Sequence, residues 1–113
     1  MKYPPHFRAR VCIFRTEDGG PRQGFFGFSD SGVRNVPVEM DGVPNMNTVG
    51  FFHTPDAVVR GGEAFEADCR VIWEEGFYPA IRPGLTFRIW DGRFIASGEV
   101  LHVYLENWKA HAV

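Results

Sequence analysis

The strongest constraint on the fold lies between residues 83 and 100, where the sequence reads PGLTFRIWDGRFIASGEV. Apolar Phe87 and Ile89 alternate with polar residues, which is the pattern of a strand with one buried face. Asp91-Gly92 provides a turn, and a second alternating run follows it. An acidic-Gly pair between two such runs is typical of a hairpin. The segment therefore predicts two antiparallel strands joined by a tight turn.

The second of these strands carries three small residues, Ala96-Ser97-Gly98, in its middle. A core strand usually fills its inward positions with bulky residues. When a small sheet closes into a barrel, however, its strands bend and approach one another closely, and small residues permit both. The small residues therefore predict a coiled last strand at a position where larger side chains would collide.

Further strand patterns precede the hairpin and are separated by turns rich in Gly and Pro. They cover Phe7–Ile13, Val33–Met40, Thr48–His53 and Phe65–Trp73, and the short aromatic stretch Phe25–Phe28 is expected to enter the core. Pro37 cannot donate to a strand ladder, so it predicts an edge or bulged position for its strand. With no helical period and no repeat, the pattern predicts an antiparallel barrel or sandwich of six or seven strands, with no helix longer than about two turns. We expect a shared core of Phe7, Val11, Phe26, Phe65, Val71, Phe87, Ile89 and Val100.

The chain of 113 residues is long enough for one core and too short for two. We expect a single domain over 1–113, with the barrel at about 7–104, an N-terminal arm at 1–6 and a C-terminal tail at 105–113. No apolar run approaches the roughly 20 residues of a membrane helix, and the N-terminal MKYPPHFRAR lacks the apolar region of a secretory signal. These features predict a cytoplasmic protein with no membrane partner.

Residues that could perform chemistry are scattered along the sequence. His6, His53, His102 and His111 have no nearby ligand residues, so we expect solvated or hydrogen-bonded histidines, no metal and no cofactor. Cys12 and Cys69 lie within strand patterns and are expected to be two buried, reduced thiols; a disulfide would require neighbouring strands. The absence of a phosphate-binding loop predicts no GTP binding. The chain is therefore expected to be non-enzymatic, with an enzyme of unrecognised type as an alternative.

Several motifs follow one another in a familiar order. They are Phe7, Ala9 and Val11; an acidic Gly19-Gly20 turn with Arg22; Phe25-Phe26-Gly27-Phe28; Gly61-Gly62-Glu63; and Gly84-Leu85, Phe87, Ile89, Asp91-Gly92, Arg93, Ile95-Ala96-Ser97-Gly98 and Val100. In this order, from about Phe7 to Tyr104, the chain resembles the C-terminal β-barrel domain of elongation factor Tu and related translational GTPases. The resemblance implies a closed or nearly closed antiparallel β-barrel. It departs from the family at SDSGVRNVPVEM and in the shorter turn of the last hairpin, where Trp90 replaces an Arg.

In the translational GTPases this barrel packs against a GTPase domain and a second barrel and helps to hold aminoacyl-tRNA. The resemblance therefore implies a protein-interaction module that docks on a partner protein or on a second copy. We expect the interface to include Tyr78, Arg88, Trp90 and Arg93, with Trp90 and Tyr78 partly exposed in one patch. An exposed aromatic residue beside arginines is typical of an anchor at a protein interface.

RNA binding in the manner of tRNA is the alternative function. Six arginines, with aromatic residues near them, could supply cations for phosphate and flat rings for bases: Arg8, Arg10, Arg22, Arg34, Arg88 and Arg93. The net charge of −2 argues against a broad nucleic-acid surface. Glu99 stands where the family has an aliphatic residue. It is either exposed at that end of the strand or partly buried and paired with Arg88 or Arg10.

Overall fold

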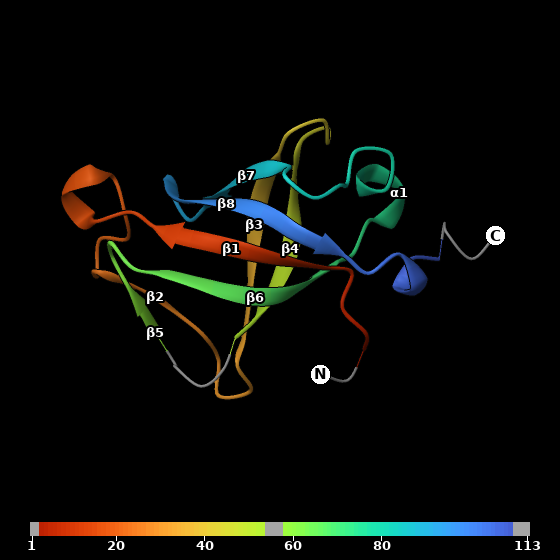
Figure 1. Ribbon diagram of the computed structural model, residues 1–113. Coiled ribbons are helices and arrows are strands. Elements are labelled where there is room, and N and C mark those ends of the chain that lie inside the picture. Colours follow the sequence, from red (N-terminus) through yellow and green to blue (C-terminus); the bar gives the residue numbers. More distant parts are fainter. Residues whose placement is uncertain (1–2, 54–57, 110–113) are drawn as a thin grey trace.

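Six strands close into an antiparallel β-barrel with the order β1-β6-β4-β3-β7-β8 around its wall, as the computed structural model shows (Figure 1). The structure describes residues 3–53 and 58–109. The strands are β1 (Phe7–Ile13), β2 (Phe25–Gly27), β3 (Val33–Met40), β4 (Met46–Phe52), β5 (Val58–Arg60), β6 (Ala64–Val71), β7 (Thr86–Trp90) and β8 (Phe94–Val103). Closure pairs the last strand with the first, so the wall of the barrel has no free outer strand.

The helices of the described ranges are short. They are the 3₁₀ turns η1 (Thr16–Asp18) and η2 (Leu105–Asn107) and the four-residue helix α1 (Glu74–Phe77). None of these helices is long and apolar enough to cross a membrane. The prediction that no helix exceeds about two turns is confirmed for residues 3–53 and 58–109.

The predicted core is confirmed in full. All eight expected core residues are buried together, each with no more than 6% of its surface exposed. In β1 the alternation of buried and open positions follows the sequence pattern from Phe7 to Ile13. Because successive strand residues point to opposite faces, this period of two places one set inside the barrel and the other on its outer wall.

The segment between β4 and β6 contains a strand that the sequence pattern did not reveal. Its described part includes β5, which pairs antiparallel with β2 to form a separate two-stranded sheet. Phe26 on β2 is buried and stacks on Phe65 of the barrel, with ring centroids 6.1 Å apart. The expectation that Phe25–Phe28 enters the core therefore holds for Phe26, whereas Phe25 is exposed.

Pro37 lies within the barrel wall, on β3 between β4 and β7. It pairs with Thr48 of β4, but the ladder between β3 and β7 starts only at Val38. Pro37 therefore faces a locally unpaired side of its strand, where a missing N–H leaves no gap in the ladder. The predicted edge or bulged position is wrong for the strand, because β3 is paired on both sides in the closed barrel.

The small residues in β8 have a specific packing role. Gly98 pairs with Phe87 of β7 and with Val11 of β1, both of which are core residues. A Cβ atom on Gly98 would lie 2.2 Å from the Cζ atom of Phe87, far inside van der Waals contact. The sequence correctly predicted a collision here, and its cause is the ring of Phe87 rather than a bend of the strand.

The boundaries of β4 and β6 differ by one or two residues from the sequence prediction. β4 begins at Met46, two residues early, and β6 ends at Val71 rather than Trp73. Trp73 immediately precedes α1, is 42% exposed and lies over Gly76, where a Cβ would come within 2.1 Å of the indole. The alternation in the sequence extends to Trp73, but the strand ends at Val71, just before the chain turns into α1.

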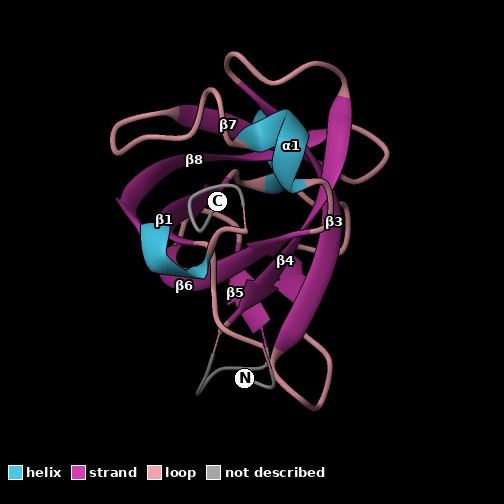
Figure 2. Ribbon diagram, turned by 90° about the vertical axis from the view of Figure 1, so that its right-hand side faces the viewer, coloured by secondary structure: helices cyan, strands magenta, loops and turns pink. Residues whose placement is uncertain are grey.

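Both terminal segments lie at the same end of the barrel as α1 (Figures 1 and 2). Part of the expected C-terminal tail is structural, because Trp108 is only 1% exposed and packs against His6 and Tyr78. His6, in the expected N-terminal arm, is equally buried. The end of the barrel is therefore covered by residues from both ends of the chain.

Candidate functional site

The outer wall near the β7–β8 turn carries a stack of one cation and two aromatic rings. The Arg88 guanidinium lies over the ring of Phe94, 3.6 Å from its centroid. On the same strands, Trp90 meets Phe94 edge to face, with ring centroids 5.1 Å apart. Both rings are half-buried, so each combines a packed side with an open one. We refer to Arg88, Trp90, Arg93 and Phe94 as the β7–β8 surface.

The arginines around this surface are fixed by acceptors within the protein. Arg88 forms an ion pair with Glu39 on β3, and Arg34 forms one with Asp91 at 3.0 Å. Arg93 donates from its Nε atom to the carbonyl oxygen of Gly20 over 3.1 Å. Because two carboxylates face two of the three cations, the local charge is largely neutralised.

Tyr78 lies far from the other three predicted interface residues. Its ring is half-buried against Trp108, beyond the C-terminal end of β8. Trp90, by contrast, pairs with Phe94 at the N-terminal end of β8. The ten residues of β8 separate the two sites by roughly 30 Å. The structure therefore brings Arg88 and Trp90 together on Phe94, while Arg93 adjoins Phe94 in the chain and has its guanidinium on Gly20. The expectation that Tyr78 shares a patch with Trp90 is wrong.

Two further arginines of the proposed basic face, Arg8 and Arg10, lie two residues apart at outward positions of β1. Arg8 pairs with Glu66 and Asp68 on β6, at 3.3 and 3.2 Å. Arg10 contacts the sulfur of Cys12 at 3.4 Å. Arg8, like Arg34 and Arg88, therefore already has a carboxylate partner within the protein.

The two cysteines occupy opposite faces of the barrel wall. Cys69 is fully buried and pairs across the sheet with Phe7, and burial raises the pKa of its thiol well above the ordinary value. Cys12 pairs with Ala64 and is only half-buried. The expectation of two buried thiols is therefore correct for Cys69 and wrong for Cys12, which takes an outward position in the alternation of β1. Both are free, and five ladder positions along β1 separate them.

Glu99 is exposed on the outer face of β8. It lies between Arg10 of β1 and Thr86 of β7 in the strand register, but within the described residues it forms no ion pair. The exposed alternative for Glu99 is therefore correct. A hollow of about 250 Å³ beside it is open to solvent and is lined by Arg10, Cys12, Thr86, Ser97, Gly98 and Glu99.

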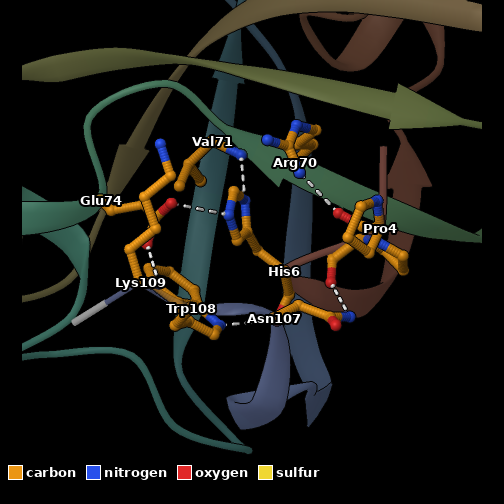
Figure 3. A network of polar contacts seen from close by, with 9 residues as sticks. Pro4, His6, Arg70, Val71, Glu74, Asn107, Trp108 and Lys109 are labelled. Carbon is orange, nitrogen blue, oxygen red and sulfur yellow. Dashed lines mark hydrogen bonds and ion pairs between the residues drawn. The ribbon is translucent and has the colours of Figure 1, made fainter. Parts of the chain in front are cut away.

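A buried polar network at the α1 end of the barrel was missed by the sequence reasoning (Figure 3). The network consists of His6, Glu74 and Trp108. Glu74 lies 68 residues after His6 in the sequence, and Trp108 lies 102 residues after it. His6 Nε2 lies 3.2 Å from Glu74 Oε2, and its Nδ1 accepts a hydrogen bond of 2.9 Å from the Val71 amide. Since Nδ1 accepts, the proton of the neutral ring is on Nε2, from which it is donated to Glu74.

Burial lowers the pKa of His6 below its ordinary value of 6.5, and the nearby charge of Arg70 lowers it further. The Glu74 carboxylate acts in the opposite direction but does not outweigh these effects. The only sequence signal for this network was a pair of residues outside the strand pattern, a histidine just before β1 and a tryptophan after β8. Neither has a periodicity that indicates burial.

Within residues 3–53 and 58–109, no three His, Cys, Asp or Glu side chains gather as a metal site would require. The charged and aromatic residues of the β7–β8 surface therefore remain the candidate site for binding. Neither a protein-family model nor a curated protein matches the sequence.

Proposed function

We propose that this protein is a non-enzymatic protein-interaction module that resembles the C-terminal barrel of elongation factor Tu and docks on a partner protein through its β7–β8 surface. The observation that carries this proposal is the stack of Arg88, Phe94 and Trp90. Two half-exposed aromatic rings beside a guanidinium have the composition of a binding hot spot. The closed antiparallel barrel is consistent with the resemblance.

The side chains of this surface are already held in place before any partner arrives. Arg88 is paired with Glu39, and Arg93 is bonded to the backbone at Gly20. Immobilising a flexible side chain upon binding costs roughly 0.5–1.5 kcal/mol. Arginines that are fixed in the free protein avoid most of this cost, which favours tight docking on a small surface.

The same ion pairs favour a protein partner over RNA. Affinity for nucleic acid comes mainly from cations that neutralise phosphates and release counterions. At the β7–β8 surface, Arg88 and Arg34 already face Glu39 and Asp91. An RNA would have to displace these carboxylates, whereas a protein partner can pack on the aromatic faces and leave the pairs intact.

The proposal is tested with a matched pair of variants, Trp90→Ala at the β7–β8 surface and Ile72→Ser at the opposite end of the barrel. Ile72 is 83% exposed, so its replacement removes an exposed apolar side chain with little effect on folding. Tagged proteins are used to capture partners from lysate, and sedimentation reports self-association. We expect Trp90→Ala to weaken association by about 2 kcal/mol, roughly 30-fold, and Ile72→Ser to leave it unchanged.

Salt and nuclease distinguish the two classes of partner. Protein docking should survive nuclease treatment and change little between about 50 and 200 mM salt, whereas RNA binding should weaken steeply over that range. Association that is lost with Ile72→Ser but kept with Trp90→Ala would place the interface at the wrong end of the barrel. Nuclease-sensitive capture would replace the proposal with RNA binding.

A further inference from the structure

Most of the hydrogen bonds that join the two terminal segments to the barrel meet at one residue, His6. Five hydrogen bonds converge on it: its amide donates to Cys69, its carbonyl oxygen accepts from Tyr104 and from the Trp108 indole, and its ring bonds to Val71 and Glu74. The network thus joins the residues before β1, the end of β6, helix α1 and the segment after β8 (Figure 3).

Neighbouring contacts strengthen the same attachment. The Trp108 ring packs on the His6 ring with centroids 4.7 Å apart. Glu74 uses its second oxygen to accept a hydrogen bond of 2.8 Å from the Lys109 amide. Asn107 donates to the carbonyl oxygen of Pro5 at 2.8 Å. Arg70 of β6 also donates to the carbonyl oxygen of Pro4 at 2.6 Å. These contacts surround His6 and link the two segments to each other and to the end of the barrel.

The arrangement requires a neutral imidazole. The buried Val71 amide donates to Nδ1, which can accept only while it carries no proton. A second proton on the ring would place two N–H donors against each other and would leave the amide without its acceptor. A buried donor without an acceptor is destabilising.

The charges around His6 both oppose and favour its protonation. Arg70 on β6 and Lys109 after η2 are cationic and oppose it, whereas Glu74 at the start of α1 favours it. The ion pair with Glu74 would offset only part of the loss, because the carboxylate is already bonded to the neutral ring and to Lys109. Protonation of His6 therefore weakens its contact with the Val71 amide of β6 more than it strengthens its contact with the Glu74 carboxylate of α1.

We propose that His6 is a pH-dependent latch: in its neutral form it holds segments 3–6 and 105–109 against the end of the barrel, and in its protonated form it releases them while the barrel stays folded. Release uncovers Trp108 and the half-buried face of Tyr78 on which it packs. The barrel persists because its closure depends on the β1–β8 and β1–β6 ladders, which begin at Phe7. This inference does not depend on the function of the β7–β8 surface.

The test follows individual N–H groups by NMR while the pH is lowered from about 7.5 to 5, a range in which histidines titrate. The protection factor compares each exchange rate with that of an unfolded chain at the same pH. For the Val71 and Lys109 amides and the Trp108 indole it should fall at least about ten-fold, with the same midpoint as the His6 ring signals. The amide of Ile89, in the opposite wall of the barrel, should remain protected. The indoles of Trp73 and Trp90 serve as internal references.

Two variants separate the latch from general effects of acid. His6→Gln retains an acceptor and a donor but cannot titrate, so its segments should stay attached across the range. His102→Gln removes an exposed histidine that lies beside Tyr104 and should behave as wild type.

Three outcomes would overturn the proposal. The first is unchanged protection of Val71 and Trp108 although His6 titrates. The second is simultaneous exchange at Ile89, which would mean global unfolding. The third is an undiminished pH response in His6→Gln. If that variant fails to fold, the wild-type titration alone still decides between release and retention.

Discussion

The indole Nε1 of Trp108 donates a hydrogen bond of 2.9 Å to the carbonyl oxygen of His6, across 102 residues of chain. The bond joins the two ends of the chain over the end of a closed barrel, and the indole itself is 1% exposed. Burial of a large aromatic ring with its polar N–H satisfied is strongly stabilising. Trp108, in the segment after β8, is therefore part of the domain core.

Replacing Trp108 with Ala should lower the free energy of unfolding by about 3–5 kcal/mol, the usual cost of removing a buried Trp or Phe ring. Chemical denaturation measures the change. Leu105→Ala is the matched control, because Leu105 lies in the same segment but is 44% exposed, and its cost should stay within about 0.5 kcal/mol. Equal effects of the two variants would show that Trp108 is not packed as described.

Gly98→Ala should destabilise the barrel by about 1–3 kcal/mol, because the new methyl group would overlap the ring of Phe87. A double-mutant cycle with Phe87→Leu tests the cause. If the ring is the obstacle, the two substitutions together should cost less than the sum of their separate effects. Strict additivity would locate the strain in the backbone of β8 instead. Ser97→Ala on the neighbouring position is the control and should be nearly neutral.

The stability of the protein should fall as the pH drops below 6.5, the ordinary pKa of a histidine in the unfolded chain. Burial lowers the pKa of folded His6, so between the two values the unfolded state binds a proton that the folded state does not. The loss is complete once the pH is below the folded pKa, and each pH unit in the window costs about 1.4 kcal/mol. His6→Gln lacks this contribution, so its melting temperature should fall less steeply than that of wild type. Parallel curves by calorimetry would contradict the assignment.

The two thiols should differ in reactivity. Cys69 is fully buried, and burial raises the pKa of its thiol, so little thiolate is present or accessible at neutral pH. Cys12 is half-buried on the outer wall and should react first with a thiol-specific reagent. We expect one fast thiol in the native protein and two after denaturation. In Cys12→Ser the fast phase should disappear; a remaining fast phase would mean that Cys69 is accessible.

Much of the barrel could be predicted from the sequence because its strands are amphipathic. In β1, β3 and β7 the buried positions follow the period of two that one inner and one outer face impose. The turn at Asp91-Gly92 was equally legible, since Gly92 adopts a φ of 76°, a left-handed conformation that favours glycine. Short elements could not be predicted in this way. The strand β5, for example, has three residues, which are too few to show a period.

The candidate site was only partly predictable, because the sequence specifies local pairing but not the position of a connection without a strand pattern. Arg88, Trp90 and Arg93 lie within one hairpin, so their proximity follows from local pairing. Tyr78 lies in a connection whose position no local pattern specifies, and the structure places it against Trp108.

The sequence by itself determined which residues of the longer strands face the core, because alternation along a strand is a local property of the chain. Only the tertiary structure decided which strands meet and what lies over the end of the barrel. The burial of His6 and the pairing of Glu74 with it depend on contacts between residues 68 positions apart. Such contacts form when the barrel closes, and closure brings together groups whose environment no single segment of the sequence contains.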